Sequence, residues 1–186
     1  ANGGTIVSFS VSPSLPAGLS LDTSTGAISG TPTAVTSSAS YTITATNTGG
    51  SDTASVTIVV NDVIPSDLDY SPNSFTLTKG TQMTTVTPTA NGGTITGWSV
   101  SPSLPAGLSL DSSTGAISGT PTAVTSSATY TITATNTGGS DTATVTIVVN
   151  DIAPSIAYSP STLTLTKGTA MTTATVTSTG GTVVSY

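Results

Sequence analysis

The sequence predicts an all-β protein made of tandem β-sandwich repeats of about 89 residues. Three observations lead to this fold class. Apolar residues alternate with Thr and Ser, the chain repeats itself at long range, and turn signals fall every 8–12 residues. Ser and Thr make up about 39% of the 186 residues, yet hydrophobic residues reach 35%, which is too apolar for a solvated, disordered tract. Thr is also well tolerated in a pleated strand.

The long-range repeat is the main signal. ANGGTI at Ala1–Ile6 recurs at Ala90–Ile95, and NTGGSDTA at Asn47–Ala54 recurs at Asn136–Ala143, both at an offset of 89 positions. A period of this length is too long for a solenoid unit and suits a small β-sandwich domain.

A second match gives the domain organisation. YSPNSFTLTKGTQM at Tyr70–Met83 recurs as YSPSTLTLTKGTAM at Tyr158–Met171, at an offset of 88 after a one-residue deletion near Ile156. We therefore divide the chain into the C-terminal two-thirds of one repeat (1–62, the first segment), a complete repeat (63–151), and the N-terminal third of the next repeat (152–186, the final segment).

Strands of the complete repeat follow from the period-2 pattern and the turn residues. The clearest pair joins Thr129–Thr135 to Thr142–Val149 through the turn NTGGSD. The other strands are expected at Ser66–Tyr70, Ser74–Thr78, Thr84–Pro88, Ile95–Val100, Leu108–Leu110 and Ala116–Ser118. DSSTG at Asp111–Gly115 predicts a second tight turn, with Asp111 as the capping side chain.

Composition excludes most chemistry. The chain has two Lys, no Arg, eight Asp, no Glu, no His and no Cys, with a net charge of −6. It therefore has no imidazole base, no thiolate, no zinc site of the usual ligands and no disulfide. Two cations cannot line a phosphate-tracking groove, and no stretch of 18 apolar residues is present. We predict no enzyme activity, no nucleic-acid partner and no membrane insertion in this segment.

Two aromatic positions suggest an immunoglobulin-like sandwich. Trp98 and its equivalents Phe9 and Tyr186 fall where such folds place a core aromatic residue on the third strand. Tyr130, like Tyr41 in the first segment, stands two residues before an isoleucine, as a tyrosine-corner residue stands before the second Cys of an antibody domain. The alternative is an ordinary strand aromatic residue packed in the core.

These residues carry a family resemblance. LPAGLSLDSSTGAISGTP at Leu104–Pro121, followed by TYTITATNTGGSDTATVTIVV at Thr129–Val149, resembles the immunoglobulin-like domain family called He_PIG, which is related to dystroglycan-type cadherin-like domains. The resemblance implies an immunoglobulin-like or cadherin-like sandwich, used as a tandem module of large secreted or surface-anchored microbial proteins. It implies an extracellular or cell-surface location and no common catalytic activity.

The junction before the complete repeat is the candidate metal site. Asn61 and Asp62 resemble part of the inter-domain segment of cadherins, where such residues help to hold calcium, and Asp67 and Asp69 add two carboxylates. Against this, Val59 replaces the first Asp of the cadherin pattern. The alternative interpretation is that these are solvated linker acids and turn-forming side chains, with no cofactor.

The two lysines are the candidate crosslink. Lys79 and Lys167 occupy equivalent positions, and some surface immunoglobulin-like domains join a Lys to Asn or Asp through an isopeptide bond. The sequence KGT is equally typical of an exposed turn, in which Lys needs no partner.

The expected function is structural. Pro65 and Pro154 stiffen short links between repeats, which predicts a semi-rigid rod. We expect a repeat of an extracellular microbial fibre, sheath or adhesin stalk, a filament whose partners are adjacent repeats or further copies, head to tail. The alternatives are a calcium-rigidified adhesive or ligand-binding module in cell adhesion, and a spacer in a large secreted enzyme.

The division of the chain adds one hypothesis. Residues 152–177 correspond to the strands that the first segment lacks, so that one copy can complete another by strand complementation. Residues 178–186 would then duplicate residues 1–9, which favours an arbitrary window from a longer array. Both interpretations stay open from the sequence.

Overall fold

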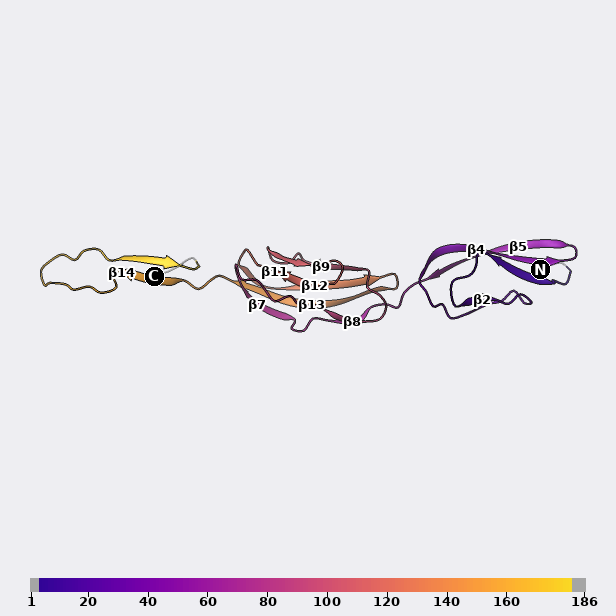
Figure 1. Ribbon diagram of the computed structural model, residues 1–186, viewed down its shortest axis with the longest axis horizontal. Coiled ribbons are helices and arrows are strands. Elements are labelled where there is room, and N and C mark those ends of the chain that lie inside the picture. The colour runs from indigo at the N-terminus through magenta and orange to yellow at the C-terminus, as the bar shows by residue number, and fades with distance from the viewer. Residues whose placement is uncertain (1–3, 182–186) are drawn as a thin grey trace. The chain divides into compact units, whose positions relative to one another are not determined.

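The computed structural model describes residues 4–181, and in this range the regular structure consists of β-strands without a helix (Figure 1). Two compact units can be distinguished. One takes in the chain up to Ser66 together with Asn91–Thr96 and Thr135–Ser140, and the other takes in Asp67–Ala90, Gly97–Ala134 and the chain from Asp141 onward. The all-β prediction is confirmed. Tyr186, one of the predicted core aromatic residues, lies outside the described residues.

The first segment forms a three-stranded antiparallel sheet and a small hairpin. The sheet has the order β1-β4-β5, and β2 pairs with β3. Thr and Ser alternate with apolar residues along each long strand, and Phe9 on β1 lies opposite Ala45 on β4. The strand bounds are Ser8–Ser12 for β1, Leu19–Leu21 for β2, Ile28–Gly30 for β3, Thr36–Asn47 for β4 and Gly50–Val60 for β5. In this order β5 is an edge strand.

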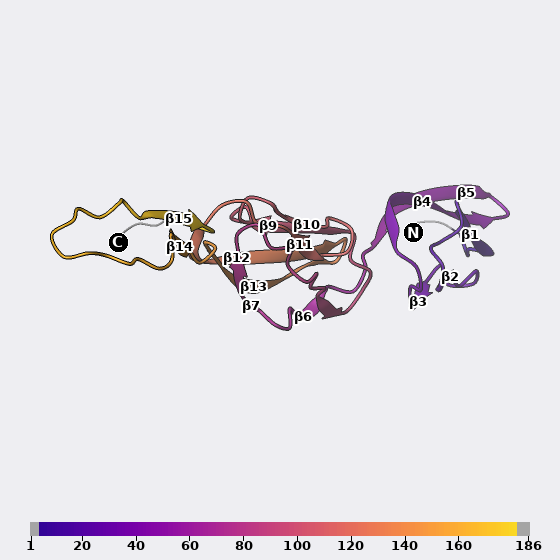
Figure 2. The same ribbon diagram turned by 60° about the vertical axis from the view of Figure 1, so that its left-hand side comes forward.

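The complete repeat adds the elements that the first segment lacks. Its main sheet has the order β7-β13-β12-β9, and two further pairs are β10-β11 and β6-β8 (Figure 2). The added strand β7 runs parallel to β13. The bounds are Ser66–Asp69 for β6, Ser74–Thr78 for β7, Thr89–Asn91 for β8, Gly97–Ser101 for β9, Leu108–Leu110 for β10, Ile117–Gly119 for β11, Thr125–Asn136 for β12 and Gly139–Asn150 for β13.

The core of the complete repeat lies between these layers. The long strands contribute Ile132 from β12 and Val145, Ile147 and Val149 from β13, all fully buried because alternate residues face one side of the sheet. Tyr130 is buried among them. The opposite layer contributes Tyr70, Met83, Val86 and Ile117. Burial of this apolar surface stabilises the sandwich.

One predicted strand is wrong. The structure has no strand at Thr84–Pro88; Val86 alone forms an isolated bridge, with hydrogen bonds in both directions to Ile117. Ile117 belongs to a three-residue strand that pairs with β10 along one edge and meets Val86 at the other, so only a short stretch of partner backbone is available there. Pro88 also lacks the N–H that a ladder needs. The Thr-rich pattern instead places Met83 and Val86 as single core contacts between exposed residues.

The final segment is a hairpin of β14 (Ser155–Ser159) and β15 (Thr175–Thr179). Every residue of both strands is exposed. The pair corresponds to β6 and β8 of the complete repeat, but within residues 4–181 no sandwich core covers it. Across residues 4–181, no helix is long and apolar enough to cross a membrane.

Candidate functional site: the repeat junction and an open sheet edge

Asp62 is the centre of the junction before the complete repeat. Its carboxylate accepts hydrogen bonds from its neighbour Val63 N (2.9 Å) and from Thr94 N (2.9 Å), which lies 32 positions away. Its own backbone N–H donates to Thr137 Oγ1 at 3.0 Å. The linker is therefore held by two loops of the complete repeat, Asn91–Thr96 and Thr135–Ser140.

Asn136 holds the next linker residue. It is only 6% exposed, and its Nδ2 donates to the carbonyl oxygen of Val63 at 2.7 Å. Its Oδ1 accepts from Gly138 N (2.8 Å) and Gly139 N (3.2 Å), which shapes the turn between β12 and β13. Gly93 N donates to the same Val63 oxygen at 3.0 Å. The buried amide and carbonyl groups thus satisfy one another.

Two glycines allow this close approach. A Cβ atom at Gly138 would lie 2.1 Å from the carbonyl oxygen of Asp62, and one at Gly93 would lie 2.2 Å from Asp62 Oδ1. Both distances are far below van der Waals contact. The GG pairs of NGGT and NTGGSD are therefore needed where the linker passes.

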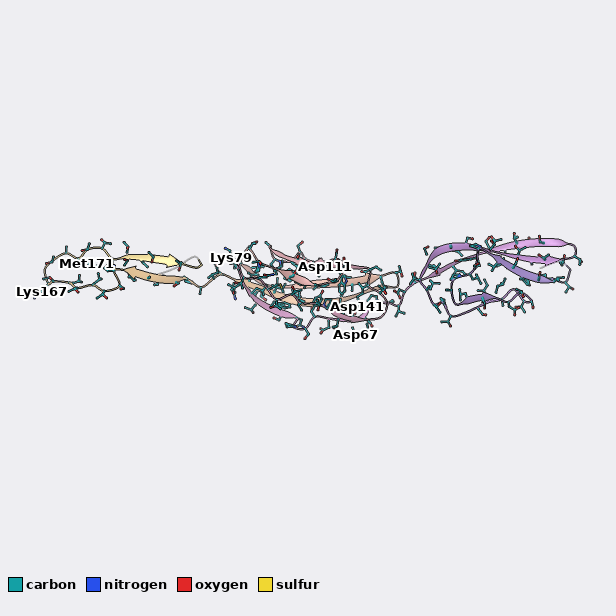
Figure 3. The ribbon with its side chains drawn as sticks, viewed as in Figure 1. Asp67, Lys79, Asp111, Asp141, Lys167 and Met171 are labelled. Carbon is teal, nitrogen blue, oxygen red and sulfur yellow. The ribbon has the colours of Figure 1, made fainter. Side chains whose placement is uncertain are left out.

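The other predicted metal residues lie elsewhere along β6. Asp67 has a positive φ of 54°, a conformation that Asp adopts more readily than most residues, and it lies where the final segment is one residue shorter. Asp69 is exposed. Asp141, which the sequence analysis did not single out, accepts a hydrogen bond from Leu68 N at 2.9 Å and fixes β6 against β13. Figure 3 labels Asp67 and Asp141.

The side chains of the junction do not converge as calcium ligands do. Within residues 4–181, no group of three acidic side chains comes together in a way that could hold a metal ion. Both oxygens of Asp62 are engaged by backbone N–H groups, and Asn61 is exposed. The acidic residues therefore do not form a cage, and calcium stays a prediction of the sequence.

The linker pattern recurs at the second junction. Asp151 Oδ1 accepts from Ile152 N at 2.9 Å, and Gly181 N donates to the Ile152 oxygen at 2.9 Å, as Gly93 does to Val63. The linker sequence and the GG pair that follows it therefore form the same local hydrogen bonds at both junctions.

The lysines lie in equivalent turns. Lys79 follows β7 and is half-buried, and its backbone N–H donates to the Asn150 oxygen at 2.9 Å. Lys167 is exposed in the loop between β14 and β15 (Figure 3). The isopeptide crosslink stays a prediction.

The DSSTG turn has the predicted cap. Asp111 Oδ1 accepts from Ser113 N (2.8 Å) and Thr114 N (2.9 Å), and these hydrogen bonds lower the pKa of the Asp111 carboxyl. Gly115 (φ 72°) ends the turn under the ring of Trp98, where a Cβ would lie 2.6 Å from a ring carbon. The first segment repeats this cap at Asp22.

The first segment has an open face. A hollow of about 550 Å³ is lined by Ile6, Phe9, Ile43, Ala45, Asp52 and Ala54, among others. The equivalents of Ile43 and Ala45, Ile132 and Ala134, are fully buried in the complete repeat. This hollow therefore marks the place that a missing layer would fill.

The sequence did not predict three of these contacts, in which Asn136, Thr94 and Asp141 hold the linker and β6. Their only sequence signal was the recurrence of NGGT and NTGGSD, of which we assigned NTGGSD to a turn. A comparison of the acid and amide positions in both copies of each motif could have marked them as candidates.

The fold defines an immunoglobulin-like β-sandwich, a class of domain that is generally non-catalytic and typical of extracellular adhesion proteins. The chain belongs to the family described as Putative Ig domain (He_PIG), whose model matches residues 1–61 and 64–150. A comparison with curated proteins gave no match.

Solved structures of similar fold include immunoglobulin and cadherin domains. Drosophila OTK extracellular domains 3–5 are 19% identical with a TM-score of 0.41, and the match covers 73% of this chain and 47% of that one. Human CDH23 EC21-23 is 19% identical with a TM-score of 0.40, covering 96% and 68%. The DSCAM N-terminal eight Ig domains are 16% identical with a TM-score of 0.43, covering 77% and 20%. The chain thus spans less than half of the OTK fragment.

Proposed function

We propose that this chain is a non-catalytic structural repeat of an extracellular microbial fibre, sheath or adhesin stalk. The observation that carries the proposal is the parallel pairing of β7 with β13, from Ser74 opposite Thr146 to Thr78 opposite Asn150. These are strands near the beginning and the end of the complete repeat.

Parallel pairing determines how the repeat bears load. Because β7 and β13 run the same way, the chain enters and leaves the sandwich at opposite ends. A pull on the two ends then slides β7 along β13 and loads their hydrogen bonds in shear, all together. Two backbone hydrogen bonds lie at the ends of this ladder. Thr146 N donates to the Asn73 oxygen (2.8 Å) at one end, and Lys79 N donates to the Asn150 oxygen (2.9 Å) at the other.

The linker supports the same function. Asp62 and Val63 are hydrogen-bonded to the loops that follow, so the connection before the complete repeat is held rather than free. Tandem repeats connected in this way suit a semi-rigid spacer. We further propose that copies of the chain join by strand complementation.

Composition is consistent with exposure outside the cell. Two Lys and no Arg leave almost no sites for trypsin-like proteases, and the absence of Cys means that folding needs no disulfide. A Thr-rich surface satisfies β propensity without charge.

Single-molecule force spectroscopy on concatemers of residues 63–151 tests the load-bearing role. We expect evenly spaced unfolding events with a contour length of roughly 300 Å per repeat, from about 3.4 Å per residue. Antibodies against the same repeat should label fibres or the surface of the source cells. Repeats that extend without a force peak, or labelling confined to the cytoplasm, would contradict the proposal.

A further inference from the structure

The open face of the first segment has the same residues as a closed face elsewhere in the chain. Ile43, Val56, Ile58 and Val60 are half-buried, and so is Ile28. Their equivalents, 89 positions on, are all fully buried; they are Ile132, Val145, Ile147, Val149 and Ile117. In the complete repeat these side chains are covered by residues 63–90, whereas no described residue covers them in the first segment.

The final segment has apolar side chains that are exposed, although their equivalents in the complete repeat are buried. Ile156 is 56% exposed, Tyr158 58% and Met171 51%. Their equivalents Leu68, Tyr70 and Met83 are 7%, 1% and 6% exposed in the complete repeat. An exposed apolar patch of this kind indicates an interaction surface.

We propose that residues 152–177 of one copy bind the open face of the first segment of a second copy, in the register that residues 63–89 have in the complete repeat. This inference rests on the proposed function and deepens it, since it names the partner, a second copy, and the contact. The occupant is argued from the complete repeat, where near-identical residues are already packed in this way.

The complete repeat specifies the hydrogen bonds expected between the copies. Leu68 N donates to Asp141 Oδ2, so Ile156 N should donate to Asp52 of the second copy. The hydroxyl of Tyr70 donates to the Gly115 oxygen, so Tyr158 should donate to Gly26.

Strand pairing extends the same register. β7 pairs in parallel with β13, and in the first segment β5 presents the corresponding edge. Residues 162–166 should therefore pair in parallel with residues 57–61, with Thr164 opposite Val59 as Thr76 is opposite Val148. This gives the edge of β5 a partner strand and satisfies its backbone groups.

Two exposed positions allow a direct test of the register. The chain has no cysteine, and both Val59 and Thr164 are exposed. We would mix a copy carrying Val59→Cys with a tagged copy carrying Thr164→Cys under mild oxidation. The mixed disulfide should form faster than either homodisulfide. A register control, Thr53→Cys with Thr164→Cys, should crosslink at least about tenfold more slowly.

Association is measured separately by light scattering of the full chain over a range of concentrations. Wild-type chain should form head-to-tail oligomers, and Tyr158→Asp should weaken association more than about tenfold, because it would bury a charge in the second copy. Thr164→Asp is the matched control, since Thr76, its equivalent, is exposed in the complete repeat. Tyr158 is itself exposed in the single chain, so its substitution leaves folding intact.

Gly49→Ala tests the receiving face. A Cβ there lies 3.3 Å from the end of the Asn47 side chain, which needs to shift only slightly, whereas at the equivalent Gly138 it would lie 2.1 Å from the backbone oxygen of Asp62. The equivalent of Asp62 is Asp151, which directly precedes the segment that binds. The variant should therefore fold but associate weakly.

Three results would overturn the proposal. They are a wild-type chain that stays monomeric at all concentrations, undiminished association of Tyr158→Asp, and a Thr164→Cys homodisulfide that dominates because final segments pair with each other. None of them bears on the unfolding force of residues 63–151, so the load-bearing function is tested independently.

Discussion

The hydroxyl of Tyr70 donates a hydrogen bond to the carbonyl oxygen of Gly115 at 2.5 Å, in the buried interior of the complete repeat. Tyr70 lies just after β6, and Gly115 ends the turn that Asp111 caps. This contact joins the N-terminal part of the repeat to the DSSTG turn and positions the glycine beneath Trp98.

Loss of this hydrogen bond should destabilise the complete repeat. Tyr70→Phe keeps the ring but leaves the Gly115 oxygen without its donor, so we expect the free energy of unfolding to fall by about 1–2 kcal/mol. Urea denaturation followed by Trp98 fluorescence measures it. Tyr158→Phe, at an exposed equivalent position, should leave this transition unchanged; an unchanged Tyr70→Phe would mean that the hydrogen bond contributes nothing net.

The same residue predicts a loss of stability in alkali. Burial raises the pKa of Tyr70 to about 12, above the ordinary value of 10.0. The unfolded state therefore releases its proton more readily, so stability is complete below pH 10 and falls as the pH rises towards 12. Unfolding midpoints between pH 9 and 12 should decline more steeply for wild-type chain than for Tyr70→Phe. Parallel curves would show that Tyr70 does not titrate in this range.

The linker predicts a sensitive glycine. Gly138→Ala would place a methyl group 2.1 Å from the Asp62 oxygen, so the linker must move away and its hydrogen bonds must break. We expect a loss of about 1–3 kcal/mol and faster hydrogen exchange at Val63 and Thr94. Gly97→Ser is the control, because a Cβ there meets nothing within 4 Å and the first segment has Ser8 at this position. Unchanged exchange in Gly138→Ala would contradict the held linker.

The parallel pairing of β7 with β13 predicts that two substitutions of Lys79 differ in stability. Lys79→Pro removes the N–H that donates to Asn150, whereas Lys79→Ala keeps this N–H and removes the side chain beyond Cβ. The proline variant should lose about 1 kcal/mol and unfold at lower force, and the alanine variant should match wild type. The intact mass of the wild-type chain also tests the crosslink hypothesis, since an isopeptide bond between Lys and Asn releases ammonia.

The calcium-binding hypothesis can be tested by thermal denaturation. A calcium ion held by Asn61, Asp62, Asp67 and Asp69 would raise the melting temperature on addition of calcium and lower it with EDTA, and Asp69→Asn would reduce the effect. Equal melting temperatures in both conditions would assign these residues to the linker and its turns alone.

Much of the fold follows from local signals. Alternation with period 2 predicts β12 and β13, and Asp111 with Gly115 predicts the tight turn, because these features depend on neighbouring residues. The segment at Thr84–Pro88 has the same Thr-rich pattern without becoming a strand, since pairing also needs a long partner edge and β11 offers only three residues there.

The long-range repeat and the absence of His, Cys, Arg and Glu are properties of the sequence by itself. The tertiary structure alone decided that Asp62 is held by Thr94, that Asn136 holds Val63 and that Asp141 holds Leu68. These contacts join residues 32 to 73 positions apart through backbone groups. Every residue has such groups, so no spacing of side chains can mark which of them meet.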